Sequence, residues 1–206
     1  MPVRFPTLEE ELHPALKYLT GNVLNAGCGN RDVSEFLLRH NATSVDNCDL
    51  ETSIPNAIIC DIADIPRDDE YYDAIFCIAV LEHVHSPERA LNEFDRVLKP
   101  GGHLVISVPF LQPFHPRPAD YRRYTRDGLA MLAETNNFEL VASRPLFALA
   151  HTITWIIWEY LVEKKKHFLK ALLWLPFYFW TRLSTRTDYS LQNNANSYQI
   201  ILKKRS

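Results

Sequence analysis

The sequence predicts an α/β fold built on a mainly parallel β-sheet, and two observations carry this prediction. Short apolar runs alternate with helical patterns through the first 144 residues, which is the arrangement of β–α units around a parallel sheet. The apolar run at residues 23–26 breaks into Gly27 and Gly29 and leads into a helical pattern, as in a strand that turns tightly beside a ligand. Plain strand-to-helix connections use the same turn, so by itself it identifies no ligand.

The length and composition indicate one globular domain. The chain has 206 residues, 47% of them hydrophobic, so we expect a single domain over residues 1–206. Each of the four cysteines, Cys28, Cys48, Cys60 and Cys77, lies in or beside an apolar run, and none forms a Cys-x-x-Cys pair. We therefore expect unlinked core cysteines in a reducing compartment, with neither a disulfide nor a metal site. No basic segment followed by an apolar one opens the chain, so the expected location is cytoplasmic.

The period of the apolar residues predicts the secondary structure. The expected strands are residues 22–26, 43–48, 57–60, 74–78, 103–109, 139–143 and 197–203, and the expected helices are residues 32–40, 87–98 and 125–136. The helix at 87–98 has the clearest signals. Ser86 can cap its first turn, Pro87 suits its first position, and the segment Lys99-Pro100-Gly101-Gly102 is expected to end it.

Residues 145–196 form a long excursion before the last expected strand. All four tryptophans lie in it, namely Trp155, Trp158, Trp174 and Trp180. Residues 145–206 carry nine basic and three acidic residues, a net charge of +6, whereas residues 1–144 carry 13 and 22, a net charge of −9. Charges and a proline interrupt the apolar stretches, which disfavours a membrane-spanning helix. We expect a helical insertion that serves as an anchor on an anionic membrane surface, as a lid or as a homodimer face.

Five segments together resemble the class I S-adenosylmethionine-dependent methyltransferases, and most closely the group called methyltransferase type 11. They are residues 23–29 (VLNAGCG), 60–66 (CDIADIP), 72–77 (YDAIFC), 81–84 (LEHV) and 96–102 (RVLKPGG), within a resemblance that covers about residues 20–143. The proline-rich segment 109–124 is similar to the same group. The resemblance implies a Rossmann-like seven-stranded sheet with helices on both faces and an antiparallel last strand. It also implies S-adenosylmethionine as cofactor and methyl transfer as activity.

The same resemblance implies the cofactor contacts. The methionine part would lie against Gly27 and Gly29, with backbone from Ala26 and Ala79, while Asp61 would accept from the adenine amino group and the Ile62 N–H would donate to the ring. A carboxylate at the end of the second strand would hold the ribose, for which Asp49 is preferred and Asp46 is the alternative. Many relatives are acidic at position 25 and have glycine at position 31. Here Asn25 can orient the loop through its amide, and Arg31 removes the third glycine.

Candidates for a catalytic base follow the fifth expected strand, at the sheet edge where open α/β folds bind ligands. They are His115, Asp120, Tyr121 and Tyr124. His115 is preferred because the ordinary pKa of histidine lies near operating pH, although it can also simply brace the loop. We expect His83 to be structural or to form a wall. The arginines at 117, 122, 123 and 126 suit a phosphate or carboxylate on the acceptor, or a solvated surface.

The expected function is methyl transfer from S-adenosylmethionine to a small-molecule or lipid-linked acceptor, in the cytoplasm or peripherally on the inner face of a membrane. The main rival is a catalytically silent cofactor-binding or scaffold protein. A nicotinamide-dependent dehydrogenase is less favoured because the glycine motif lacks its third glycine. A nucleic-acid partner is not expected, since the acidic balance of residues 1–144 is wrong for binding phosphates.

Overall fold

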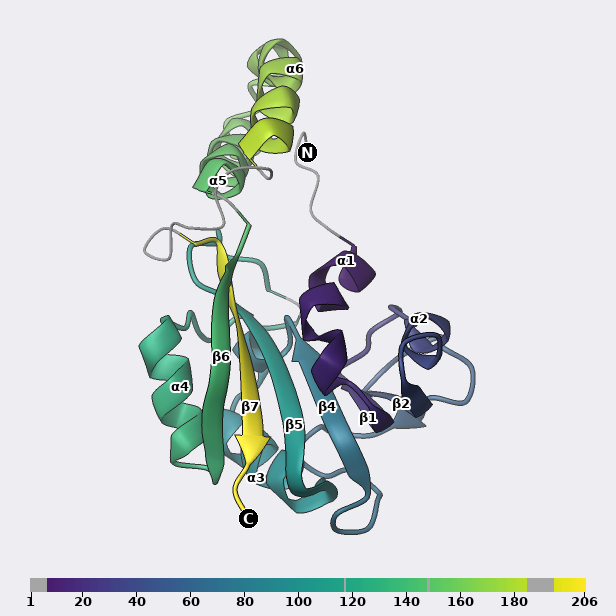
Figure 1. Cartoon of the computed structure of the whole chain (residues 1–206). Helices are drawn as coiled ribbons and strands as arrows, with labels where there is room; N and C mark the ends of the chain where they lie inside the picture. Colours follow the sequence, from purple (N-terminus) through teal and green to yellow (C-terminus); the bar gives the residue numbers. More distant parts are fainter. Residues whose placement is uncertain (1–6, 117, 148, 185–194) are drawn as a thin grey trace.

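The computed structural model describes residues 7–116, 118–147, 149–184 and 195–206. Seven strands form one sheet in the order β3-β2-β1-β4-β5-β7-β6 (Figure 1). Their bounds are β1 (Gly21–Ala26), β2 (Ala42–Asp49), β3 (Ile58–Ile59), β4 (Tyr72–Ile78), β5 (Leu98–Pro109), β6 (Phe138–Leu146) and β7 (Ser197–Lys204). Strands β1 to β5 pair in parallel, and β7 is antiparallel to both neighbours. The predicted α/β sheet with an antiparallel last strand is confirmed.

Helices cover both faces of the sheet, as predicted. On one face, α1 (Leu8–Leu12), η1 (His13–Tyr18) and α2 (Ser34–Leu38) pack over one buried apolar cluster. On the other face, α3 (Pro87–Val97) and α4 (Arg126–Glu134) pack over a second cluster. Successive strand residues alternate between the two, so Val23 belongs to the first cluster and Leu24 to the second. Because both faces are buried, the strands read as continuous apolar runs.

Helix α3 begins at Pro87 as expected but ends one residue earlier than expected. Ser86 is the residue before the helix, but its side chain makes no capping hydrogen bond. The expected stop at residues 99–102 is wrong, because the helix ends at Val97 and the chain passes directly into β5. Leu98 is fully buried and pairs with Tyr72 of β4, so pairing within the sheet takes over from the helix at that residue.

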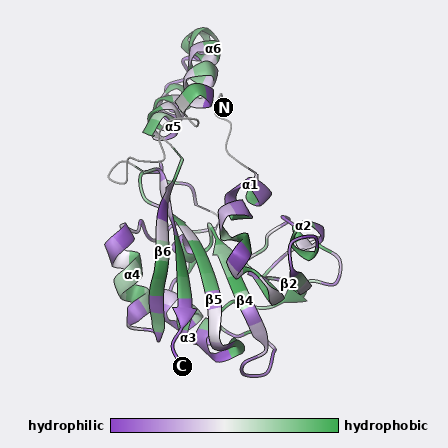
Figure 2. Ribbon diagram, viewed as in Figure 1, coloured by the Kyte–Doolittle hydropathy of each residue, from purple (hydrophilic) through white to green (hydrophobic). Residues whose placement is uncertain are grey.

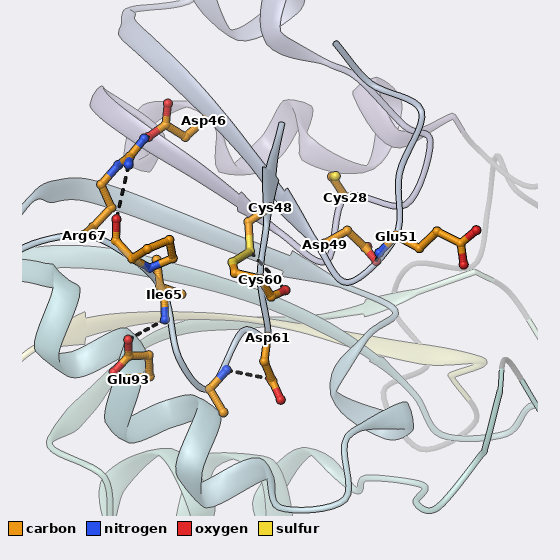
Figure 3. The surroundings of a disulfide bond; sticks show 12 residues. Cys28, Asp46, Cys48, Asp49, Glu51, Cys60, Asp61, Ile65, Arg67 and Glu93 are labelled. Atoms are coloured by element: carbon orange, nitrogen blue, oxygen red, sulfur yellow. Dashed lines mark hydrogen bonds and ion pairs between the residues drawn. A yellow bond between two sulfur atoms is a disulfide. The ribbon is translucent and has the colours of Figure 1, made fainter. Parts of the chain in front are cut away.

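The expectation of unlinked cysteines is wrong for two of the four. Cys48 and Cys60 form a disulfide between the ends of β2 and β3, with their Cα atoms 6.2 Å apart (Figure 3). The two strands are neighbours in the sheet, and Cys48 pairs with Ile58, two residues before Cys60. This proximity depends on strand pairing, which cysteine spacing alone does not reveal. Cys28 and Cys77 are free and buried.

The excursion contains two helices, α5 (Leu149–Glu163) and α6 (His167–Ser184), which confirm a helical insertion before the last strand. They pack against each other as a hairpin that projects beyond the sheet, on the side where the parallel strands end (Figure 1). The first turns of α5 are buried, and Asn196 donates a hydrogen bond of 3.0 Å to Thr152. Within the described residues, none of the helices combines the length and the apolar character needed to cross a membrane.

Candidate functional site

The turn after β1 is held tightly against its neighbours. Gly27 and Gly29 have φ values of 75° and 53°, in the left-handed region that favours glycine. The N–H groups of Gly27 and Cys28 both donate to the carbonyl oxygen of Cys48, at 2.8 and 3.0 Å. A Cβ atom at Gly27 would lie 2.4 Å from a methyl carbon of Val80, whereas one at Gly29 would meet nothing within 4 Å. The backbone therefore approaches β4 closely at Gly27 and faces open space at Gly29.

Two carboxylates stand where strands β2 and β3 end. One oxygen of Asp49 accepts a hydrogen bond of 2.7 Å from the N–H of Gly29, so this carboxylate is fixed to the glycine turn. Asp61 is exposed and accepts from the N–H of Ala63 at 2.9 Å, while Ile62 beside it is buried. The Cys48–Cys60 disulfide directly precedes both carboxylates, and it ties together the two strand ends that carry them (Figure 3).

Asp46 has a different environment. It pairs with Leu24 in the body of β1, away from the turn. One of its oxygens accepts two hydrogen bonds from Arg67, at 3.0 and 3.2 Å (Figure 3). The same oxygen accepts a third from the Tyr72 hydroxyl at 2.8 Å. Burial and the Asp46 carboxylate raise the pKa of Tyr72. The surroundings of Asp46 thus join β2 to β4 and to the loop that follows β3.

The side chains at positions 25 and 31 organise the loop after β1. Asn25 is buried, and its amide donates to Asn47 at 2.8 Å and to the carbonyl oxygen of Arg31 at 3.2 Å. Arg31 in turn donates to the carbonyl oxygen of Ile78, the last residue of β4, at 2.8 Å. Ala26, the last residue of β1, is fully buried. The arginine that replaces the third glycine therefore bridges two strand ends.

Ala79 and Glu11 complete this edge of the sheet. Ala79 follows β4 with φ of 54°, an uncommon conformation for alanine, and its N–H donates to Ser107 of β5 at 2.9 Å. Glu11, from α1, reaches the same edge. Burial raises the pKa of its carboxyl group, against the opposing effects of a hydrogen bond from Ser107 and the charge of Arg31. The sequence offered no signal for Glu11 beyond its place in an acidic run.

The loop after β5 is held by an ion pair between Asp120 and Arg123. Both oxygens of the fully buried Asp120 carboxylate accept from Arg123, at 2.5 and 2.6 Å, and one also accepts from the N–H of His115 at 2.8 Å. Arg123 holds the pKa of Asp120 down at about 2. An anchored carboxylate with such a low pKa is a poor proton acceptor, so Asp120 positions the loop and His115.

His115 faces a carboxylate that the sequence analysis did not single out. Glu82, in η2 (Leu81–His83), is fully buried, and neither of its oxygens accepts a hydrogen bond. Its Oε1 atom lies 3.8 Å from Nε2 of His115 and 3.7 Å from Nε2 of His83. The Glu82 carboxylate raises the pKa of His115 above its ordinary value, although partial burial of the ring opposes this. The Leu-Glu-His-Val motif contains Glu82, but only the fold shows that His115 meets it.

The two tyrosines of this loop differ in exposure. The side chain of Tyr121 is 52% exposed and its ring lies edge-on to His85. Tyr124 is buried, which raises the pKa of its hydroxyl, and this hydroxyl donates to the carbonyl oxygen of Leu81 at 3.4 Å. Tyr121 is therefore the tyrosine that an acceptor molecule can reach.

The arginines of this region are largely engaged within the loop. Arg122 donates to the carbonyl oxygens of the two residues before Ser86, at 2.7 and 3.0 Å, and Arg123 is held by Asp120. Arg126 pairs with Asp127 on the surface. Arg117 lies outside the described residues. Arg122 and Arg123 therefore stabilise the loop, and they do not form a free cationic cluster that could bind an anion.

Helix α5 reaches the same loop. The indole ring of Trp155 lies 5.7 Å from the imidazole ring of His115, between ring centres. Trp155 also donates to Glu159, one turn later in the helix, at 3.2 Å. The inserted hairpin therefore forms one wall beside the predicted base.

The predicted residues thus fall into two neighbouring groups at the carboxyl ends of the parallel strands. Around the turn lie Asn25, Ala26, Gly27, Gly29, Asp49 and Ala79, with Asp61 and Ile62 at the end of β3. In and against the loop after β5 lie His115, Asp120 and Tyr121, with Glu82. Asp46 belongs to neither group.

Comparisons with known proteins find similarity to methyltransferases over part of the chain. A family model described as a methyltransferase domain matches residues 24–106. The ubiquinone biosynthesis O-methyltransferase of Coxiella burnetii is 31% identical over 120 residues, which cover 52% of this chain and 50% of that protein. The tRNA (carboxymethyluridine(34)-5-O)-methyltransferase of Arabidopsis thaliana is 31% identical over 97 residues, which cover 42% of this chain and 23% of that protein. The chain thus spans about half or less of the length of these relatives.

A solved structure matches over nearly the whole chain. It is the 1,6-didemethyltoxoflavin-N1-methyltransferase of Burkholderia thailandensis, crystallised with 1,6-didemethyltoxoflavin and S-adenosylhomocysteine. The TM-score is 0.62 at 16% identity, covering 96% of this chain and 76% of the other. Identity this low shows a shared fold and leaves the acceptor open.

Proposed function

We propose that this chain, whose residues 24–106 match a methyltransferase-domain model, is a class I S-adenosylmethionine-dependent methyltransferase that binds this cofactor and transfers its methyl group to a small-molecule acceptor. One observation carries the proposal. The turn after β1 combines two left-handed glycines, an open face at Gly29 and a carboxylate, Asp49, bonded to the Gly29 N–H. Such a turn lets a ligand approach the backbone and offers an acceptor for its hydroxyl groups.

The cofactor-side roles follow from the hydrogen bonds already present. Each carboxylate oxygen has two lone pairs, so Asp49 can accept from ribose hydroxyls while one oxygen stays bonded to Gly29. Asp46 is the weaker choice because it pairs with Leu24 in the body of β1, away from the turn, where it holds Arg67 and Tyr72. Gly27, Gly29 and the backbone of Ala26 and Ala79 would line the methionine part. Asp61 and the N–H of Ile62 would take the adenine.

The acceptor-side roles follow from the loop after β5. When bound, S-adenosylmethionine would supply a methyl group activated on a sulfonium, for transfer to an acceptor oxygen or nitrogen as the carbon–sulfur bond breaks and S-adenosylhomocysteine leaves. For an oxygen acceptor, His115 Nε2 takes the departing proton, and the Glu82 carboxylate 3.8 Å away stabilises the imidazolium that results. Asp120 positions His115 through its backbone N–H, and the accessible ring of Tyr121 orients the acceptor.

The experiment is transfer of a radiolabelled methyl group from S-adenosylmethionine to lipid and soluble cell extracts, with products identified by mass spectrometry. We expect one labelled product class with the wild type and none with Gly27→Val. Tight cofactor binding without any transfer would instead support the rival, a catalytically silent binding or scaffold protein.

The role of His115 is tested by His115→Ala once a product is known. We expect kcat to fall by a factor of about 10² or more, while cofactor affinity measured by calorimetry stays within a few-fold. The matched control is His85→Ala, a nearby histidine that points at Tyr121 rather than at Glu82. A near-normal kcat for His115→Ala would reduce this loop to a positioning role.

We infer further that the acceptor is lipid-linked and that α5 and α6 dock on the anionic inner face of a membrane. Within residues 149–184 the hairpin carries five basic and two acidic residues, with three consecutive lysines at its turn. Several of its large apolar residues are exposed, including Phe168, Leu172 and Leu183, at 79%, 60% and 65%. Hydrophobic and hydrophilic residues alternate in colour along both helices (Figure 2). Exposed aromatic and aliphatic residues beside lysines suit an interfacial anchor.

Trp155 supports a link between this anchor and the chemistry, since it lies beside His115. A bilayer under the hairpin would then deliver its acceptor next to the base. Flotation with anionic and neutral vesicles tests the proposal, and we expect salt-sensitive binding to the anionic ones only. No binding to either, with a dimer in size-exclusion chromatography, would favour the homodimer face, and a monomer with shielded tryptophans would favour the lid.

A further inference from the structure

Three side chains that ligate metals converge in the loop region after β4 and β5. They are Glu82, His83 and His115, and one ligand atom from each lies within 4.8 Å of the other two. The closest separations are 3.7 Å from Glu82 Oε1 to His83 Nε2 and 3.8 Å to His115 Nε2. Donors bound to one tetrahedral zinc ion lie about 3.3 Å apart, so binding an ion would shorten each of these two separations by about half an ångström and would bring the two histidine nitrogens to a similar distance.

The two histidines present their Nε2 lone pairs to this centre. His83 Nδ1 lies 2.5 Å from the carbonyl oxygen of Ala119, and His115 Nδ1 lies 2.8 Å from that of Pro113. A carbonyl oxygen only accepts, so each Nδ1 carries the proton. Arg123 Nη2 also lies 3.2 Å from His115 Nδ1, but its shorter hydrogen bonds, at 2.9 and 2.6 Å, go to Pro113 and Asp120. Backbone carbonyls that fix histidine tautomers in this way are typical partners of metal ligands.

The third donor lacks a neutralising partner at close range. The Glu82 carboxylate is fully buried and accepts no hydrogen bond. A buried charge of this kind is costly unless a cation or several donors compensate it. The side chains of His83 and His115 are 15% and 23% exposed, so the centre is partly open to solvent.

We propose that Glu82, His83 and His115 bind one divalent transition-metal ion, of the Zn²⁺ class, through Oε1 and two Nε2 atoms. Two histidines, one carboxylate and an open position are the ligand set of catalytic zinc sites. Binding of the ion stands independently of the proposed function. Its use rests on that function, because an ion at the open position would bind an acceptor oxygen and favour its deprotonated form. One Nε2 lone pair either holds the ion or takes a proton, so the ion would replace His115 as the activating group.

The test is titration of the chelator-stripped full-length chain with Co²⁺, followed by visible absorption, and then displacement of Co²⁺ by Zn²⁺. We expect one saturable equivalent in the wild type. His115→Asn and His83→Asn should each weaken Co²⁺ binding at least about tenfold. His85→Asn is the matched control, because this exposed histidine contacts Tyr121 and Ser86 instead, and it should bind as the wild type does.

Absence of a saturable equivalent in the wild type, or unchanged affinity in His115→Asn, would overturn the proposal. Glu82→Gln is not used as a deciding variant, because a substitution at a buried residue can unfold the chain. Thermal melting followed by circular dichroism checks that the other variants are folded. Calorimetry with S-adenosylmethionine on the same samples separates the two proposals. A bound ion without cofactor binding would contradict the proposed function alone, and cofactor binding without an ion would contradict this inference alone.

Discussion

The turn after β1 and the hairpin of α5 and α6 differ in how far the rest of the chain packs against them. The turn has hydrogen-bond partners and close neighbours, whereas the hairpin exposes apolar side chains. In the turn, the N–H groups of Gly27, Cys28 and Gly29 all donate to neighbouring strand-end groups, and Val80 closes the space beside Gly27. In α6, large apolar side chains are exposed along the helix, and of its residues 167–183 only Thr181 is buried. The turn is pre-organised by its own fold, whereas the hairpin leaves a surface for something else to cover.

The largest expected effect comes from a substitution in the turn after β1. Gly27→Ala places a Cβ atom 2.4 Å from Val80 and forces alanine into a left-handed conformation. We expect a loss of about 3 to 4 kcal/mol in the free energy of unfolding, from crowding and backbone strain together, with cofactor binding lost as well. Urea denaturation and calorimetry measure the two effects.

Gly29→Ala is the matched control, because it shares the left-handed φ but meets no neighbour within 4 Å. Only backbone strain of about 1 to 2 kcal/mol should remain. Equal losses in the two variants would mean that strain alone, and not the close approach at Val80, sets the requirement for glycine at position 27.

The next effect tests the hairpin. Replacing Lys164, Lys165 and Lys166 by glutamine removes three charges at its turn. Each lysine near an anionic surface contributes about 1 kcal/mol, so binding to anionic vesicles should fall by about 100-fold. Flotation measures the loss, and unfolding should stay unchanged because these side chains are exposed. Unchanged flotation would contradict the proposal that these lysines contribute to membrane binding.

A smaller effect separates the two acidic residues of β2. Asp49→Ala should weaken S-adenosylmethionine binding about tenfold or more, because hydrogen bonds to a charged group are worth about 1.5 to 3 kcal/mol. Asp46→Ala should instead lower the free energy of unfolding by about 1 to 3 kcal/mol, because Arg67 and Tyr72 lose the carboxylate that accepts their hydrogen bonds. Its affinity for S-adenosylmethionine should stay near that of the wild type. The reverse pattern in calorimetry would move the ribose contact to Asp46.

The sequence predicted the sheet and its strands because apolar runs and helical periods are local signals. The glycine turn was also predictable from local sequence, since glycine is the residue type that favours the left-handed conformation found at Gly27 and Gly29. The Glu82 and His115 contact joins residues 33 positions apart in the chain, and the disulfide joins Cys48 to Cys60 across paired strands. Both depend on which strand ends become neighbours. No period or spacing in the chain encodes that arrangement, so these features emerged only from the fold.

Strand and helix ends were less predictable because tertiary pairing moves them. Helix α3 stops at Val97 since Leu98 enters the sheet, and Asp32 accepts from the N–H of Ser34 at 2.9 Å, so α2 begins at Ser34 rather than at residue 32. The ring of Trp155 beside His115 was also beyond local signals. The tryptophan cluster indicated that α5 is unusual. It did not indicate which part of the core α5 would contact.

The smallest expected effect concerns the scaffold that holds the loop after β3 against α3. Glu93 accepts hydrogen bonds from Arg96 at 2.7 and 2.9 Å. It also accepts one from the N–H of Ile65 at 2.7 Å (Figure 3). Arg96 and that backbone N–H hold the pKa of Glu93 below its ordinary value, against the effect of burial. A carboxylate with a depressed folded-state pKa stabilises the protein above its unfolded-state pKa, and this stabilisation is lost as pH falls through the folded value.

Glu93→Gln should therefore lower the free energy of unfolding by about 1 kcal/mol at pH 7, because the charged partner of Arg96 is lost. The difference from the wild type should shrink progressively as the pH is lowered below the ordinary range of a glutamate pKa. The control is Glu35→Gln, whose pair with Arg39 is exposed and worth no more than about 0.5 kcal/mol. Urea denaturation across this pH range decides the matter. A Glu93→Gln deficit that persists undiminished into acid would assign the effect to side-chain packing at Ile65 rather than to the charge, and the loop carrying Asp61 would then be held by shape alone.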